Sequence, residues 1–165
     1  MTTLCRSGGA ASAVLAGLLT VLVPSAVAAD GPFAALSGSW SGGGQMRFSG
    51  GNTEALKCRA YYTTKETGSS MGLAIRCAST SNKIELRANL QYAVGGSVTG
   101  SWEERTFNTT GDVTGQASAS RINLSIKGGG FSGSMLVGTT GSTQSVTIHT
   151  EGITLKSVNI NLSKG

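Results

Sequence analysis

Two cysteines, Cys58 and Cys77, have three candidate roles in this 165-residue sequence: a redox pair, a metal site or a disulfide. The sequence has no Cys-x-x-Cys motif, and its one histidine cannot complete a tetrahedral zinc site with two thiols. If the two cysteines face each other across a hairpin, Thr67 and Gly68 remain as a two-residue loop, which is a favoured hairpin length. We therefore predict a structural disulfide between neighbouring strands.

Candidate acids, bases and nucleophiles are scattered along the chain. His149 has the strand parity of polar residues, opposite to that of Val146 and Ile148, so we expect it on an outer face. Glu103 and Glu104 are sequence neighbours, and neighbouring side chains in a strand point to opposite faces, so they cannot form an acid and base pair. The sequence has no Gly-x-Ser-x-Gly turn between a strand and a helix, which is the setting that activates such a serine. We predict a protein that is not an enzyme, with no catalytic residue, metal or cofactor.

The elements that position these residues are strands, because apolar and polar residues alternate with period two. The alternation runs through residues 36–48, 56–63, 71–77 and 84–92, then through shorter segments up to Leu162, and glycine-rich turns separate the segments. A change of parity between Leu155 and Val158 predicts a β-bulge near Lys156 or Ser157. The pattern predicts an all-β fold, an antiparallel up-and-down meander of about 8–10 strands closed as a barrel. A β-sandwich is the alternative.

Large aromatic residues share the inward parity with glycines, which contribute no side-chain volume. Two interpretations follow: bare positions leave a cavity for a small ligand, or the rings fill the space and the glycines allow strong coiling of the strands. Under the first interpretation Glu104, at the parity of Trp102, meets a polar group at the mouth of the barrel. The candidate ligand-binding residues are Trp40, Tyr62, Tyr92, Trp102, Glu104 and Phe131.

The first 29 residues have the features of a secretory signal peptide: an early Arg6, an apolar run, a break at Pro24 and small residues before Asp30. We therefore predict a signal peptide at 1–29, which removes Cys5, and a single exported domain at 30–165, in the periplasm or outside the cell. Residues 30–165 contain 12 Lys and Arg against 8 Asp and Glu. This surplus is mild and no ladder of stacking aromatics accompanies it, so we expect no nucleic acid partner.

Five cations share the outer parity of three consecutive predicted strands, with Glu85 expected beside Arg76. They are either an ordinary solvated face or a contact surface for an anionic envelope component. The residues are Lys57, Arg59, Arg76, Lys83 and Arg87.

The segments "DGPFAALSGSWSGGG", "CRAYY", "LAIRCAS" and "VTGSWEE" resemble a family of small exported proteins of Gram-negative bacteria without an established activity. The resemblance covers nearly all of residues 30–165; it implies a periplasmic or secreted β protein and transfers no catalytic residue. Gly38-Ser39-Trp40 is also similar to the Gly-x-Trp of lipocalin-like barrels, in which the tryptophan closes one end of the barrel beneath a ligand cavity. The arginine partner usual in those barrels is not identified in this sequence.

The resulting prediction is a non-catalytic exported binding module of lipocalin-like type for a small apolar or amphipathic ligand. The alternative is an envelope or surface interaction protein that uses its outer polar and basic face. A small outer-membrane barrel is a third reading, because lipid-facing and lumen-facing residues also alternate. The sequence leaves the oligomeric state open.

Overall fold

The computed structural model describes Thr2 and residues 30–165, so the predicted signal peptide, apart from Thr2, lies outside the described residues. A single-turn 3₁₀ helix, η1 (Ala34–Leu36), precedes the first strand. Ten strands follow, and a second 3₁₀ turn, η2 (Glu66–Gly68), lies between β2 and β3. The strands are β1 (Gly38–Phe48), β2 (Thr53–Lys65), β3 (Ser70–Ala78), β4 (Lys83–Tyr92), β5 (Ser97–Glu104), β6 (Thr109–Ala117), β7 (Arg121–Gly128), β8 (Phe131–Thr140), β9 (Thr143–Glu151) and β10 (Leu155–Lys164).

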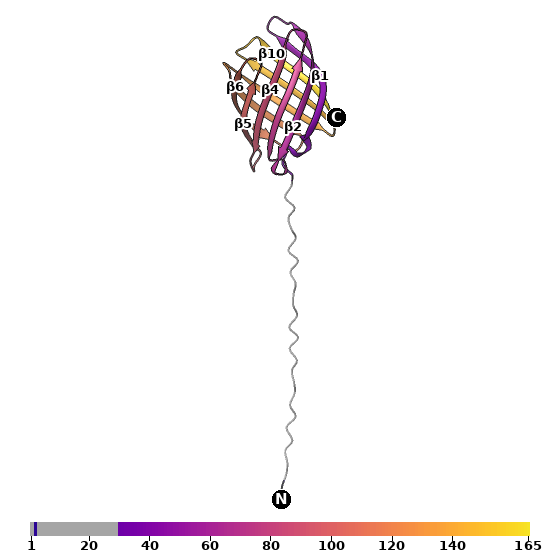
Figure 1. The fold of residues 1–165 in the computed structure, drawn as a ribbon. Helices are drawn as coiled ribbons and strands as arrows, with labels where there is room; N and C mark the ends of the chain where they lie inside the picture. Colours follow the sequence, from indigo (N-terminus) through magenta and orange to yellow (C-terminus); the bar gives the residue numbers. More distant parts are fainter. Residues whose placement is uncertain (1, 3–29) are drawn as a thin grey trace.

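Each strand pairs antiparallel with its sequence neighbours, and β1 pairs with β10 to close the sheet (Figure 1). The predicted up-and-down barrel is therefore confirmed, and the sandwich alternative is wrong because one continuous sheet surrounds the core. Inward positions are predominantly apolar and outward positions predominantly polar in the residues described. A membrane barrel needs an apolar outer band, so the outer-membrane reading gains no support. No helix among the described residues is long and apolar enough to cross a membrane.

The β2–β3 hairpin has the predicted register. Cys58 lies directly opposite Cys77, with 4.1 Å between their Cα atoms, and the disulfide is formed. Thr67 and Gly68 have φ angles of 54° and 88°. Positive φ at both central residues is the requirement of the tight hairpin turn whose twist matches that of its strands. The Ser69 amide closes the turn by donating to the carbonyl oxygen of Glu66 at 3.2 Å.

The predicted bulge in the last strand is also confirmed. Arg47 on β1 pairs with Ser157, whereas the next residue, Phe48, pairs with Leu155. Lys156 is therefore the extra residue, and it restores the inward facing of Val158 after Leu155.

The inward glycines have a different role from leaving cavity volume. A Cβ atom on Gly100 would lie 2.1 Å from the carbonyl oxygen of Asn89, and one on Gly115 would lie 2.1 Å from that of Asn123. In both cases the obstructing atom belongs to the backbone of the adjacent strand. The glycines thus permit the close approach of coiled strands, as the second interpretation in the sequence analysis expects.

Candidate functional site

One end of the barrel is closed by the segment around η1. Phe33 and Leu36 are fully buried there, and the indole Nε1 of Trp40 donates to the carbonyl oxygen of Leu36 at 2.7 Å. The Phe33 amide donates to the carbonyl oxygen of Gly68 at 3.2 Å, which ties the segment to the β2–β3 turn. We call this the closed end; the described chain begins there (Figure 1).

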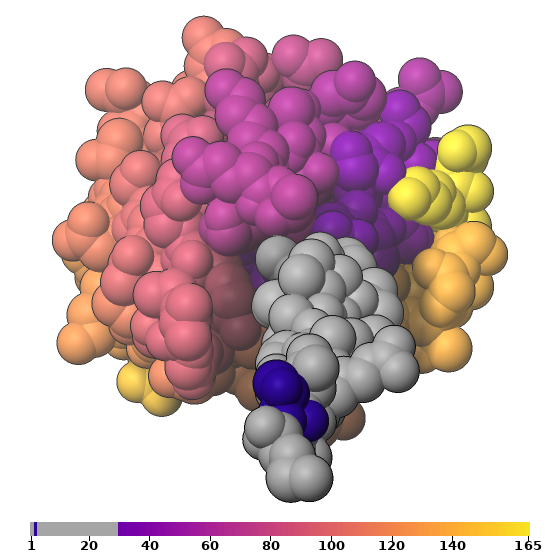
Figure 2. Space-filling view, turned by 90° about the horizontal axis from the view of Figure 1, so that it is seen from below, coloured from indigo at the N-terminus to yellow at the C-terminus, as the bar shows by residue number. Residues whose placement is uncertain are grey.

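Lys164 is a partner of Trp40 that the sequence analysis did not identify. Its Nζ lies 5.6 Å from the centroid of the Trp40 ring and donates to the carbonyl oxygen of Ala35 at 3.1 Å. The C-terminal residues lie beside the first strand in the view onto this end (Figure 2). One cation thus holds both the ring and the η1 segment that covers it.

A buried polar bridge lies next to this closure. The Tyr62 hydroxyl on β2 donates to Oε1 of Gln144 on β9 at 2.6 Å, and the two strands are separated by β1 and β10. Burial raises the pKa of Tyr62 to about 12. Gln144 was missed in the sequence analysis, although it has the inward parity of Val146. Its exposed fraction is 2 %, and its Nε2 has no hydrogen-bond partner among the described residues.

Some inward apolar side chains beyond the closed end are only partly buried, whereas others, such as Met46 at 1 % exposure, are fully buried. Other inward residues, such as Cys58 and Val113, are only 3 % exposed. The backbone atoms of these two residues, which lie toward the outside of the barrel, therefore contribute little accessible area. We infer that part of the additional exposure lies inside the barrel; Leu73 and Ile84 also border hollows on the outer face. We call the residues that have this additional exposure the lumen wall: Leu73 and Ile75 on β3, Ile84 and Leu86 on β4, Met135 on β8 and Ile148 on β9.

The lumen wall has two facing sides. In the barrel order, β8 and β9 lie five strands away from β3 and β4, on the other side of the interior. Partial exposure on both sides is the pattern expected of an interior that side chains do not completely fill. The end at which β3 finishes and β4 begins, where Phe48, Phe131 and Leu155 are also only partly buried, is the open end.

The six candidate ligand-binding residues form two groups rather than one. Trp40 and Tyr62 pack edge to face at the closed end, with ring centroids 6.3 Å apart, and Tyr92 contacts Phe33 there at 6.4 Å. These contacts pack the three rings at the closed end, where they help to close the barrel.

The second group lies toward the open end. The rings of Trp102 and Phe131 are 5.4 Å apart, and the Nε1 atom of Trp102 is buried without a hydrogen-bond partner in residues 30–165. A Cβ atom on Gly111 would lie 2.6 Å from that Nε1. The indole of Trp102 therefore extends across the Gly111–Gly128 pair of β6 and β7 and contacts Phe131 on β8.

Glu104 is inward and buried, as its parity predicts, and both of its carboxylate oxygens already accept backbone hydrogen bonds. Oε1 accepts from the Glu85 amide at 2.8 Å, and Oε2 accepts from the Phe107 amide at 2.7 Å. These contacts fix the β5–β6 turn. A role of Glu104 in ligand binding stays a prediction.

The described residues offer little for catalysis. His149 lies exposed on the outer side of β9, opposite Ser134 and Ser157. Within the part of the chain that the structure describes, no group of three or more His, Cys, Asp and Glu residues is placed to hold a metal ion. The absence of catalysis and of cofactors stays a prediction.

Comparison with solved structures places this barrel in a class. The chain is similar to Rv2717c from M. tuberculosis, with a TM-score of 0.63 and 13% identity over 79% of this chain and 93% of that one. It is also similar to the S-type phycobiliprotein lyase CPES from Guillardia theta, with a TM-score of 0.54 and 12% identity over 81% and 90% of the two chains. At these identities the likeness concerns the fold, which is a closed antiparallel barrel of the lipocalin-like type.

The comparisons do not identify the family to which this chain belongs. No family model matches the sequence, and no curated protein matches it. The resemblance to the exported Gram-negative family therefore stays a prediction.

Proposed function

We propose that this protein is an exported, non-catalytic binding protein that holds a small apolar or amphipathic ligand in the barrel lumen. One observation carries the proposal: the lumen wall points inward and yet keeps accessible apolar surface on two facing sides. Concave apolar sites of this kind are typical of small-ligand binding. Burying that surface against a ligand is favourable by about 25 cal/mol per Å².

The surroundings of the lumen define the chemistry of the ligand. The lumen wall is entirely aliphatic or thioether, and the oxygens of Glu104 are engaged by backbone amides. An apolar body is therefore held inside the lumen. Because η1 covers the closed end, the ligand enters by the open end and leaves any polar group there.

The disulfide supports the exported setting, because such bonds persist in oxidising compartments. We expect the mature protein from its native host to begin near Asp30 and to contain no titratable thiol. N-terminal sequencing together with thiol titration checks both. Two reactive sulfurs in the exported protein would contradict the assignment.

Two neighbouring residues of β8 provide a matched test of the lumen. Met135 belongs to the lumen wall, whereas Leu136 points outward and is 41 % exposed. Met135→Trp places an indole in the lumen, while Leu136→Trp adds the same ring to the outside. We expect the delipidated native protein to bind cis-parinaric acid, a fluorescent fatty acid, with Met135→Trp lowering the affinity at least about 10-fold and Leu136→Trp leaving it unchanged.

Circular dichroism verifies that both variants keep the β spectrum. If the native protein does not bind this probe and carries no apolar molecule when purified from its host, the proposal is wrong. Equal affinities of the two folded variants would place binding outside the lumen and would also contradict it.

A further inference from the structure

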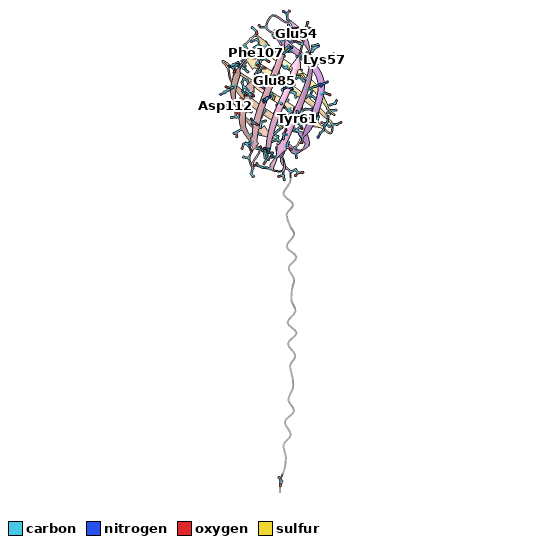
Figure 3. All side chains as sticks on the ribbon, viewed as in Figure 1. Glu54, Lys57, Tyr61, Glu85, Phe107 and Asp112 are labelled. Atoms are coloured by element: carbon cyan, nitrogen blue, oxygen red, sulfur yellow. A yellow bond between two sulfur atoms is a disulfide. The ribbon has the colours of Figure 1, made fainter. Side chains whose placement is uncertain are left out.

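The outer face of β1 to β4 contains a hollow that the lumen proposal does not use. Its floor is made of small outward residues, Ser41 and Gly43 on β1 and Ala74 and Ala78 on β3. Longer side chains of β2 and β4 stand on either side of the β3 floor. We call this hollow the basic groove; Lys57, Tyr61 and Glu85, which contribute to it, are labelled in Figure 3.

Cations dominate the groove and its margin. Two acidic residues, Glu85 and Glu103, share this face with six basic ones, a surplus of four positive charges. That surplus is as large as the surplus of residues 30–165 as a whole. The six are Lys57, Arg59, Arg76, Lys83, Arg87 and Arg105.

The local carboxylates do not balance these charges. Glu85 already contacts three guanidinium groups, those of Arg76 at 3.3 Å, Arg87 at 3.5 Å and Arg105 at 3.4 Å. The hydrogen bond from Arg76 and the three positive charges lower the pKa of Glu85, so it is ionised near neutral pH, and its Oε1 is shared by all three guanidinium groups. Lys57 forms no ion pair within the described residues.

Two like charges also face each other across the groove. Arg59 on β2 is the direct cross-strand partner of Arg76 on β3, and Arg59 has no carboxylate partner in residues 30–165. Like charges at directly opposite positions destabilise a strand pair. A bound anion between the two guanidinium groups would remove this repulsion.

The shape of the site selects among anionic partners. Tyr61 follows Arg59 on the same face of β2 and is 58 % exposed, so its ring is available beside the cations. A flat membrane surface cannot reach the floor of a hollow, whereas a single extended chain can. Nucleic acid binding uses several stacking aromatics, and this face presents one.

We propose that the basic groove binds an acidic polysaccharide, with sugar carboxylates between Arg59, Arg76 and Lys57 and a sugar ring against Tyr61. This site is separate from the lumen, because outward and inward side chains of the same strands form the two. The proposal therefore stands or falls independently of the lumen ligand.

The test uses the mature protein, a galacturonic acid dodecamer as the probe and isothermal titration calorimetry at low salt. We expect the double variant Lys57→Gln/Arg59→Gln to lower affinity about 10-fold. The matched control is Arg121→Gln/Lys127→Gln on β7, on the far side of the barrel, which makes the same change in net charge. It should leave the affinity within about 2-fold of the native value.

The ring contribution has its own variants. Tyr61→Ala should weaken binding about 5-fold, while Tyr61→Phe should retain it because the ring surface remains. Met135→Trp, which fills the lumen, should not change binding of the dodecamer.

The proposal is overturned if the acidic dodecamer binds no tighter than a neutral maltodextrin of equal length. It is also overturned if the β2 and β7 double variants lose affinity equally, because binding would then follow net charge alone. Tighter binding to phosphatidylglycerol vesicles or to oligothymidylate than to the dodecamer would identify another class of partner and reject this one.

Discussion

The two ends of the barrel are built from the same alternating strands and differ in what covers them. At the closed end, η1 places Phe33 and Leu36 over the interior, and Trp40 and Leu162 are 1 % and 2 % exposed. At the open end no comparable segment lies over the lumen in the described residues, and Ile84 keeps accessible surface.

This difference indicates that the two ends of the barrel have different roles, one in stability and the other in ligand access. Inward parity alone decides only that a side chain points to the interior; beneath η1 it is packed, whereas near the open end Met46 is buried and Ile84 keeps accessible surface. The closed end should therefore contribute most of the stability, and the open end should tolerate change and accept a ligand.

Trp40 should show the largest effect on stability. Trp40→Ala removes a buried indole together with its hydrogen bond to Leu36, and we expect a loss of about 3–5 kcal/mol in the free energy of unfolding, measured by urea denaturation. Trp40→Phe, which keeps an aromatic ring, should lose less. Equal losses for the two variants would show that the ring contributes nothing.

Leu162 and Leu86 compare the two ends with the same substitution. Leu162→Ala at the closed end should cost about 2–4 kcal/mol, because it leaves a cavity in a packed region. Leu86→Ala in the lumen wall should cost less than about 2 kcal/mol, because part of the side chain is already accessible. Urea denaturation of both variants checks the order, and the reverse order would contradict the comparison.

Tyr62 should make the closed end sensitive to alkali. Its pKa is about 12 in the folded protein and about 10 when unfolded, so its contribution is intact below pH 10 and is lost as pH rises through 12. We expect about 2–3 kcal/mol of alkaline destabilisation from this group. Unfolding curves across that range check it.

The controls for this prediction are two tyrosine variants. Tyr62→Phe should remove the dependence, and Tyr61→Phe on the outer face should leave it unchanged. A native protein whose phenolate absorbance rises in one step near pH 10 would contradict the buried assignment of Tyr62.

Lys164 should give the smallest effect. Lys164→Gln keeps much of the side-chain stem and removes the cation over Trp40, so we expect a loss of about 0.5–1 kcal/mol in urea denaturation. Lys127→Gln on β7 has no such ring beneath it and serves as the control. If both variants lose the same free energy of unfolding, the contact between Lys164 and Trp40 makes no specific contribution to stability.

The features predicted correctly from the sequence depend on local order. The Cys58–Cys77 register follows from parity and a two-residue turn, and the bulge at Lys156 follows from a parity change within one segment. Glu85 lies beside Arg76, as the β3–β4 register predicts.

Features that depend on distant segments were not predicted. Tyr62 and Gln144 are 82 residues apart in the sequence, and the Lys164 contact with Ala35 joins the two ends of the barrel sequence. Which aromatic rings close the barrel and which border its lumen depends on where η1 lies, and inward parity is the same in both groups. The roles of Gly100 and Gly115 likewise depend on the path of the adjacent strand.

The most direct test of the accessible lumen is methyl NMR of the apo protein under xenon pressure, because xenon enters apolar cavities. The account predicts chemical-shift changes at the methyl groups of Leu86 and Ile148 and none at Leu36. Uniform small shifts, or shifts confined to Leu36, would contradict it and would mean that the interior is packed along its whole length.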